Sequence, residues 1–284
     1  MPSAAAKPRF RRVALIGKPG TPEIEASLRE MRASLGRRGC EVLEPGDTSA
    51  DLAVVIGGDG SMLAAARELV RHKVPLVGIN QGRVGFMTDI GHHDMQAGIG
   101  AILDGNYTIE ERTLLDAEIR RGEQAVMRTI ALNEAVVGKG AQGRLIEFEL
   151  WLDGEFVYSL RADGMIVCTP TGSTGYALSA QGPILHPAVP ALALVPLNPH
   201  TLSARPVSVA DRCTIEIRLV RALDAQAYFD GVAHADMAEG DCLVLKRSAD
   251  AMRFVHPPGY RYFATLREKL RWSEAPLRKG RGTE

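Results

Sequence analysis

The sequence predicts an α/β amino-terminal domain, built on a doubly wound and mainly parallel sheet, followed by an all-β domain. Short apolar runs and stretches of helical periodicity alternate over the first 80 residues or so, as they do in doubly wound folds. Further along, apolar and polar residues alternate one by one, which is the period of half-exposed strands. We therefore expect an α/β domain over 1–112, a β-rich domain over 113–262, and a carboxyl-terminal helix over 263–284 that packs back on the first domain.

The first domain is expected to follow a strand–helix order. Its elements are a strand at 12–17, a helix at 24–35, a strand at 40–43, a strand at 52–56, a helix at 62–71 and a strand at 74–79. The run 52–56 is apolar throughout, as a parallel strand covered on both faces should be. Ligands bind such folds at the carboxyl ends of the strands, and a glycine-rich turn at 57–61 lies at such an end.

The second domain is expected to consist of strands. Alternating patterns mark strands at 115–120, 147–152, 156–160, 215–219 and 243–245. Asp153-Gly154 between two of them is a hairpin signal. Met165 to Cys168 is also strand-like, and helical spacing returns at 263–272.

Composition narrows the classes of protein that fit. The 284 residues are 45% hydrophobic and 24% charged, which is ordinary for a globular chain. Lys plus Arg equals Asp plus Glu at 34 each, so no net field attracts nucleic acid or an anionic membrane. The four cysteines are scattered, and no apolar stretch approaches the roughly 20 residues of a membrane helix. We expect a cytoplasmic protein without nucleic-acid or membrane partners.

The turn Gly57-Gly58-Asp59-Gly60-Ser61 carries the main chemical signal. Glycines let backbone N–H groups approach an anion closely, and the helix that follows adds its positive end. A plain strand-to-helix turn would explain the glycines but not Asp59, because phosphates repel a carboxylate that neither holds a metal nor accepts a proton. Phosphoryl transfer gives such a carboxylate a use, since the attacking hydroxyl must lose its proton.

Two familiar nucleotide motifs are excluded. No G-x-x-x-x-G-K-[ST] occurs in the chain, so it is not a Walker-type NTPase. The G-x-G-x-x-G fingerprint of dehydrogenases fails because Leu63 stands where its last glycine is required. No residues are singled out as metal ligands.

A second polar group lies in the β-rich half. The loop Thr169 to Tyr176 combines hydroxyls with glycines, and Arg161 and Asp163 precede it. Its hydroxyls can donate to phosphate, ribose or base, but by composition alone a plain Ser/Thr-rich loop is an equal alternative. Asn133-Glu134 forms a further polar pair after an apolar run.

Together these segments resemble the NAD kinases, which phosphorylate the adenosine ribose 2′-hydroxyl of NAD to make NADP. The matching pieces are Gly57 to Leu63, Leu132-Asn133-Glu134, Ala162-Asp163-Gly164, Thr169 to Tyr176, Pro199 to Leu202, and Tyr262 to Trp272. The GGDG turn alone is shared with phosphofructokinase and with diacylglycerol and sphingosine kinases. The NE pair and the PTGST loop are much more specific.

The resemblance implies roles for individual residues. Asp59 would accept the proton of the 2′-hydroxyl, with Gly57, Gly58 and Gly60 at the phosphates, and Asn133 and Glu134 would hold NAD. Thr171 and the run Thr174, Gly175, Tyr176, Ala177, Leu178 and Ser179 would line the adenine and ribose pocket. Further NAD-binding positions are Phe86, Arg144, Arg161 and Asp163, the last often across a subunit interface. Arg161 is similar to the branch that prefers NAD over NADH and ATP over polyphosphate.

The implied substrates are NAD and ATP, with a divalent cation, Mg²⁺, accompanying ATP, and the implied assembly is a homodimer or homotetramer. The chain departs from the family pattern at Ser61, Gly175, Gln181 and Val232, which stand where threonine, alanine, glycine and glutamine are usual. Two alternatives stay open. One is a lipid kinase with the same glycine turn, and the other is a regulator that binds NAD without catalysis.

Overall fold

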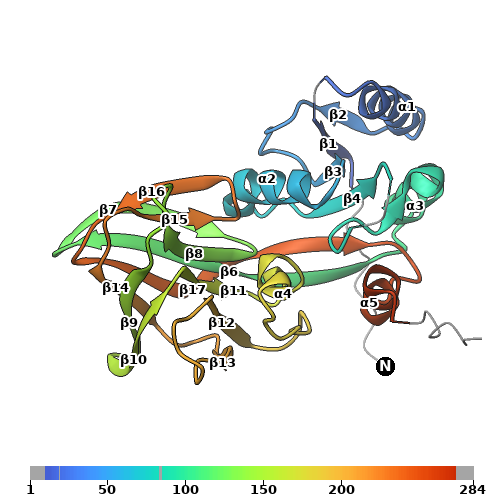
Figure 1. Ribbon diagram of the computed structural model, residues 1–284. Helices are drawn as coiled ribbons and strands as arrows, with labels where there is room; N and C mark the ends of the chain where they lie inside the picture. The colour runs from blue at the N-terminus through green and yellow to red at the C-terminus, as the bar shows by residue number, and fades with distance from the viewer. Residues whose placement is uncertain (1–9, 19, 83–84, 273–284) are drawn as a thin grey trace, which may run out of the picture.

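The computed structural model describes residues 10–18, 20–82 and 85–272. Its first part is a parallel sheet with helices on both faces (Figure 1). The strands are β1 (Arg12–Gly17), β2 (Glu41–Leu43), β3 (Leu52–Ile56) and β4 (Leu76–Asn80), in the order β4-β3-β1-β2. The helices are α1 (Pro22–Arg37), α2 (Asp59–Leu69) and α3 (Met95–Leu103). This confirms the predicted doubly wound architecture.

The uninterrupted apolar strands have a simple cause, because both faces of the sheet are covered. Val54 and Ile56 of β3 pack in the cluster with residues of α1 and α3. Val55 between them packs on the opposite face, with residues of α2. Successive side chains of a strand point to opposite faces, so each position in β3 needs an apolar residue.

The second part is a sandwich of two sheets that share one apolar core. One sheet contains β6 (Thr108–Arg121), β7 (Gln124–Ala131), β9 (Ile146–Leu152), β10 (Glu155–Ala162), β14 (Ile215–Arg221) and β17 (Asp241–His256). The other contains β8 (Glu134–Lys139), β11 (Gly164–Cys168), β12 (Ala191–Leu197), β13 (Val207–Ala210), β15 (Ala225–Phe229) and β16 (Ala233–Met237). Phe148, Met165 and Phe229 lie in the core between them. The predicted β-rich part is confirmed.

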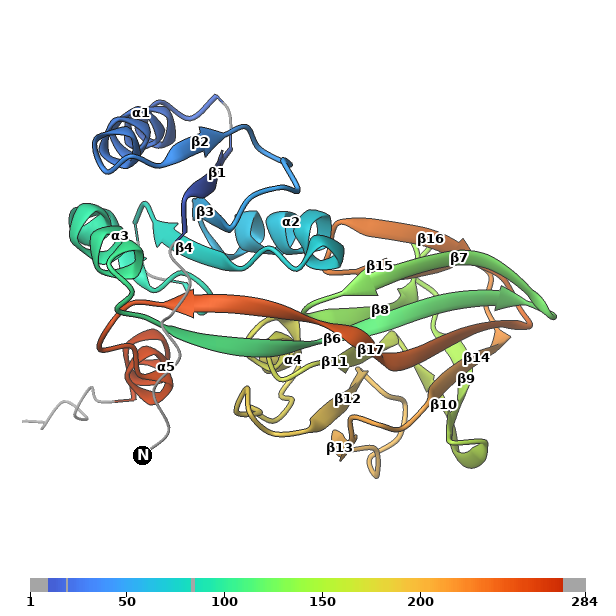
Figure 2. The ribbon, with the colours of Figure 1, turned by 180° about the vertical axis from the view of Figure 1, so that it is seen from behind.

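Strand β17 joins the two parts. It pairs antiparallel with β6 along most of its length and parallel with β4 at Phe254 and Leu76. The parallel sheet and one sheet of the sandwich therefore form a single sheet of 11 strands, which the two ribbon views show from front and back (Figures 1 and 2). The two-residue strand β5 (Ile90–Gly91) pairs parallel with the end of β4.

Short helices complete the fold. They are the 3-10 helices η1 (Val70–His72), η2 (His92–Asp94) and η3 (Gly172–Thr174), and the α-helices α4 (Tyr176–Ser179) and α5 (Tyr262–Leu270). The apolar side of α4 packs on the outer face of the six-stranded sheet, where Ala177 contacts the cluster that contains Ile166 and Val195. No helix in the described ranges has the length and apolar character needed to cross a membrane.

Three details differ from the expected elements. Helix α2 begins at Asp59, three residues before the predicted start, because Gly58 is extended and its carbonyl already accepts the N–H groups of Ser61 and Met62. No bounds were predicted for helix α3, since its glycines lower helix propensity. Strand β6 crosses the expected boundary at 112/113, and the domain bounds stay a prediction.

The carboxyl-terminal helix is shorter in the described residues than the predicted segment. Tyr262 in this helix contacts the β-rich part: its hydroxyl donates to the Leu185 carbonyl at 3.4 Å, and its ring meets the ring of His186. The packing of the helix on the first domain stays a prediction. Residues 273–284 of that segment, and Arg83 in the turn after β4, lie outside the described residues.

Candidate active site

Asp59 stands in the first turn of α2, at the carboxyl end of β3. A helix amino terminus carries unsatisfied N–H groups and a positive dipole end, which favour a negative group there. Gly57 is fixed by an N–H bond of 2.9 Å to the Ile79 carbonyl of β4, while Gly58 and Gly60 are exposed. The glycine turn thus presents a half-buried carboxylate beside exposed backbone.

The segment after β4 holds the Asp59 carboxylate. The N–H groups of Phe86 and Met87 each donate to one Asp59 oxygen at 3.0 Å. A Cβ at Gly85 would lie 2.0 Å from Asp59 Oδ1, so only glycine permits this approach. An ionised carboxylate has about four lone-pair sites. Two remain for a reacting hydroxyl, and Phe86, a predicted NAD-binding residue, lies beside Asp59.

Asn133 and Glu134 lie between β7 and β8, and a buried carboxylate fixes their backbone. Asp230 accepts the N–H groups of Leu132, Asn133 and Glu134 at 2.9, 2.7 and 3.2 Å. Leu132 packs in the same cluster as Met62 of α2 and Met87. The NE pair and Asp59 are therefore brought to one junction between the two parts.

Both residues of the NE pair present an unused acceptor. Asn133 Oδ1 and Glu134 Oε2 are buried and have no hydrogen-bond partner within the described ranges of the chain. Buried acceptors without partners are costly unless a ligand supplies the donors. Burial raises the pKa of Glu134 to about 7, and the charge of Asp230 adds to the effect. The pair is suited to a ligand rich in hydroxyl or amide donors.

The loop after β11 wraps the backbone of the NE pair. Thr169 donates from its hydroxyl to the Leu132 carbonyl at 2.5 Å and from its N–H to the Asn133 carbonyl at 2.9 Å. A Cβ at Gly172 would lie 2.1 Å from the Asn133 carbonyl oxygen. The buried Thr171 hydroxyl is 3.4 Å from Nη1 of Arg112. Thr174 donates to the Thr171 carbonyl at 3.1 Å, which closes the turn.

A pocket of about 360 Å³ opens beside the NE pair. It falls in the usual size range of ligand sites. Its lining residues are Glu134, Val136, Gly138, Lys139, Asp163, Tyr176, Leu197, Asn198, Tyr228 and Gly231. The structure thus brings the predicted residues Glu134, Asp163 and Tyr176 to one cavity. Gly175 lies next to it, because a Cβ there would be 3.6 Å from Glu134 Oε2.

Asp163 is already engaged within that pocket. Lys139 Nζ is 2.6 Å from one Asp163 oxygen, and the Asn198 amide donates to the other at 2.8 Å. The hydrogen bonds from Lys139 and Asn198 hold the pKa of Asp163 below its ordinary range. A ligand that reaches Asp163 therefore meets an ion pair, not an isolated carboxylate.

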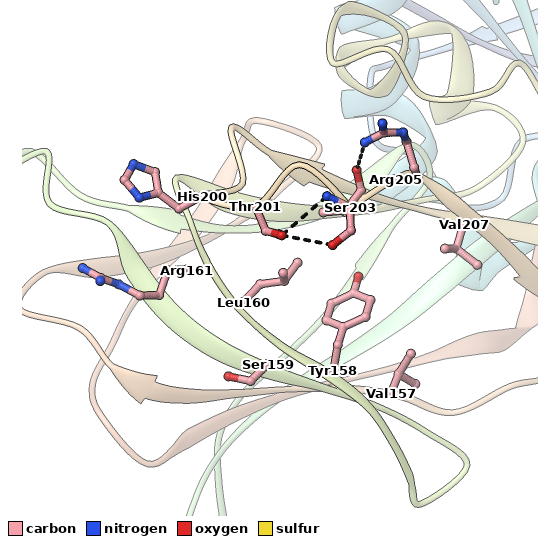
Figure 3. Close-up of a pocket in the computed structure, with 11 residues that line it drawn as sticks. Val157, Tyr158, Ser159, Leu160, Arg161, His200, Thr201, Ser203, Arg205 and Val207 are labelled. Atoms are coloured by element: carbon pink, nitrogen blue, oxygen red, sulfur yellow. Dashed lines mark hydrogen bonds between the residues drawn. The ribbon is translucent and has the colours of Figure 1, made fainter.

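Other predicted positions lie away from this pocket. Arg161 lines a separate and larger pocket of about 600 Å³ (Figure 3), where its side chain lies near His200 and the Tyr158 hydroxyl points inward. That pocket contains none of the other predicted residues, so its size alone does not mark it as the reaction site. Arg144 is exposed in the turn before β9.

The remaining positions belong to α4. Ala177 is fully buried, so its side chain packs under the helix and does not face the pocket. Leu178 is half-buried and Ser179 is exposed at the end of α4. Of the departures from the family pattern, Gln181 has a left-handed φ of 63°, a conformation that glycine adopts more easily. Val232 is 61% exposed beyond the Asp230-Gly231 turn.

Sequence reasoning missed two residues that shape the site. Asp230 could have been found, because Asp-Gly is a strong hairpin-turn signal between strands. Nothing nearby in the sequence shows that its carboxylate reaches residues 132–134. Lys139 gives no signal at all, since its partner Asp163 meets it only through the pairing of β8 with β11.

Comparison with known families matches both parts of the chain. The family model described as "ATP-NAD kinase N-terminal domain" matches residues 13–107. The one described as "ATP-NAD kinase C-terminal domain" matches residues 132–257. These ranges contain the glycine turn, the NE pair and the loop after β11.

Similar proteins and structures extend over nearly the whole chain. A protein of Azoarcus sp. (strain BH72) named "NAD kinase" is 52% identical over 94% of this chain and 98% of its own. One of Thiobacillus denitrificans with the same name is 48% identical over 93% and 98%. The crystal structure of an NAD kinase from Archaeoglobus fulgidus in complex with ATP has a TM-score of 0.77 at 27% identity, over 92% of this chain and 98% of its own. Yeast NADH kinase complexed with NADH has a TM-score of 0.88 at 22% identity, over 98% and 91%, which shows a common fold.

Proposed function

The chain belongs to the NAD kinase family, and we propose that it transfers the γ-phosphoryl group of ATP to the adenosine ribose 2′-hydroxyl of NAD, giving NADP and ADP. The observation that carries this proposal is the placement of Asp59. Its carboxylate stands at the start of α2, held by two backbone N–H groups and next to exposed glycines.

Asp59 is proposed as the proton acceptor. The ribose hydroxyl would donate to a free lone pair of its carboxylate and lose its proton as the new P–O bond forms. The two N–H donors from Phe86 and Met87 fix the carboxylate before substrate binds. Gly57, Gly58 and Gly60 would let the backbone at the start of α2 approach the phosphates.

The NE pair is proposed to hold the dinucleotide. The unpartnered Asn133 Oδ1 and Glu134 Oε2 would accept from hydroxyl or amino groups of NAD. Tyr176 and Tyr228 in the same pocket offer aromatic surface for a flat ring. Asp163 would contact NAD through its ion pair with Lys139. Arg161, in its separate pocket, and the exposed Arg144 would contact NAD only from its far end or in an assembly of subunits.

ATP is proposed as the donor and Mg²⁺ as its companion. The Archaeoglobus structure, described as a complex with ATP, supports this donor. Mg²⁺ would enter as part of the substrate, bound to phosphates whose charge it neutralises. No residue of this chain is assigned to it.

We further propose that the protein acts in the cytoplasm as a homodimer or homotetramer. Its four cysteines are all free thiols, which suits a reducing compartment. Leu202 is 94% exposed in the loop between β12 and β13 and would be covered by a second subunit.

The test is the reaction itself. Purified protein is incubated with NAD, Mg²⁺ and either ATP or polyphosphate, and NADP is measured. We expect NADP with ATP and none when NAD is omitted. A parallel assay with labelled ATP and diacylglycerol should give no labelled lipid. Saturable NAD binding without NADP from any donor would instead identify a non-catalytic regulator.

A further inference from the structure

His256, the last residue of β17, is a buried histidine between two carboxylates. It is 2% exposed. Its Nδ1 makes a short contact with Asp89 Oδ2, and its Nε2 lies 3.0 Å from Glu110 Oε2. A carboxylate only accepts hydrogen bonds, so both ring nitrogens must donate, and an imidazole that donates from both is an imidazolium. The Tyr260 ring stacks on this cation at 3.8 Å.

The pairing of β6 with β17 places Arg112 next to Glu110 and so extends the cluster toward the sandwich. Glu110 of β6 lies opposite Phe254 of β17, and Arg112 lies opposite Met252, so their side chains share one face of the sheet. The Arg112 guanidinium donates to Glu110 Oε2 at 2.8 Å and lies 5.4 Å from the centre of the Phe254 ring. Arg112 is itself 3% exposed. Two cations and two carboxylates thus form a cluster with no net charge, in which only the Glu110 side chain is appreciably exposed.

Each end of the cluster reaches one half of the candidate active site. Arg112 Nη1 is 3.4 Å from the Thr171 hydroxyl in the loop after β11. At the other end, Asp89 follows two residues after Met87, whose N–H holds Asp59.

We propose that His256 is a positioning residue, whose imidazolium fixes segment 85–89 and loop 169–175 relative to each other through Asp89, Glu110 and Arg112. It touches neither substrate and acts through the residues at both ends. The inference rests on the proposed function for the roles of Asp59 and Thr171, but the contacts themselves do not depend on it.

The charge balance explains why this histidine must be charged. Burial by itself would lower the pKa of His256, but the hydrogen bonds and charges of Asp89 and Glu110 outweigh it and raise the pKa above its ordinary value. Tyr260, which faces the ring from the other side, has its own pKa raised by burial and stays neutral. A neutral His256 could donate to only one of the two carboxylates. As pH rises through the raised pKa, the link between the two halves should weaken.

The first test measures amide hydrogen exchange in the full chain. His256→Gln keeps one donor at nearly the same reach but carries no charge. We expect exchange about tenfold faster in residues 85–89 and 169–175, with α1 and β9 unchanged, because one charged hydrogen bond contributes roughly that factor. Glu110→Gln, whose side chain is partly exposed, should give the same pattern if His256→Gln fails to fold. Wild-type exchange in both segments would overturn the proposal. This readout needs no activity, so a protein that makes no NADP refutes the proposed function and leaves the inference testable.

The second test is a double-mutant cycle on the KM for NAD. His256→Gln and Thr171→Val should each raise this KM about tenfold, and the double variant should raise it little further, because both break one connection. The KM of wild type should rise on the alkaline side, and this rise should be absent in His256→Gln. His72→Gln, an exposed histidine outside the cluster, serves as the matched control and should combine additively with Thr171→Val. Additive effects of His256→Gln and Thr171→Val would contradict the proposal.

Discussion

Glu134 shows how burial of one carboxyl sets the chemistry of the pocket proposed for NAD. Burial raises its pKa to about 7, so both protonation states are populated near neutral pH. Its Oε2 has no hydrogen-bond partner among the residues that the structure describes. The ionised form is the better acceptor for a ribose hydroxyl, since charged hydrogen bonds are about twice as strong as neutral ones.

NAD affinity should therefore depend on pH through this residue. The Kd for NAD should fall as pH rises from 6 to 8, because NAD selects the ionised Glu134. Calorimetric titration at several pH values measures this Kd. In Glu134→Gln the change of the Kd around pH 7 should be absent. A step of the same size in Glu134→Gln would assign the pH dependence to another group.

The raised pKa of Glu134 also makes the stability of the folded protein depend on pH. The folded pKa of about 7 lies above the ordinary 4.5, so the folded protein holds the extra proton between these values. Stability from this group therefore decreases as pH rises from about 4.5 to 7. Glu134→Gln should melt at a higher temperature than wild type at pH 8, and the difference should vanish near pH 4.5.

Two glycines of the loop after β11 make a matched pair. A Cβ at Gly172 would meet the Asn133 carbonyl at 2.1 Å, whereas one at Gly175 would have its nearest neighbour, the Gly172 carbonyl, at 3.3 Å. Gly172→Ala should lower the free energy of unfolding by about 1–3 kcal/mol and raise the KM for NAD, because the NE pair must move. Gly175→Ala should change both far less. Thermal melting measures the change in stability, and steady-state kinetics measure the KM for NAD. Equal effects of the two variants would contradict the close packing at Gly172.

At the scale of elements, the turn between β15 and β16 anchors the start of β8. Asp230 has a left-handed φ of 53° and accepts three backbone N–H groups. Asp230→Ala removes all three acceptor contacts and should lower the free energy of unfolding by about 3 kcal/mol. Asp230→Asn keeps one acceptor oxygen and tolerates the backbone angle, so it should retain most of the stability. Urea unfolding measures the stability of both variants. Equal losses of stability would show that the acceptor oxygen kept in Asp230→Asn contributes little.

Elements with strong local signals were predictable, and elements defined by partners were not. The apolar run 52–56 and the helical spacing at 24–35 gave β3 and α1 closely. The start of α2 was placed three residues late because glycines usually mark a turn.

The candidate site was predictable where residue types were unusual for their position. Asp59 among glycines stands out in the sequence, whereas the NE pair is singled out only through the family resemblance, and the structure brings both to one junction. The Asp89–His256 contact joins residues 167 positions apart in the chain. No local pattern encodes such a contact, because it arises only when β17 pairs with both β6 and β4.

At the scale of the whole molecule, the continuous 11-stranded sheet leads us to expect that the two parts unfold as one cooperative unit. Leu52 lies in the parallel part and Phe148 in the sandwich, and both are fully buried. Leu52→Ala and Phe148→Ala should each lower a single shared melting midpoint, because β17 couples the sheets, at a cost of about 2–5 kcal/mol. Far-UV circular dichroism and the fluorescence of Trp151 in β9 follow the transition. Two separate transitions in Leu52→Ala, with Trp151 unaffected in the first, would contradict this coupling.

The central claim is that Asp59 accepts the proton of the NAD hydroxyl at the junction of the two parts. Asp59→Asn keeps an acceptor for the 85–87 segment but loses the basic carboxylate. The decisive measurement is kcat for NADP formation in Asp59→Asn, alongside the Kd for NAD and the melting temperature. We predict a kcat lower by about 10²–10⁴-fold, with the Kd and the melting temperature close to wild type. A folded Asp59→Asn variant with the kcat of wild type would contradict the account.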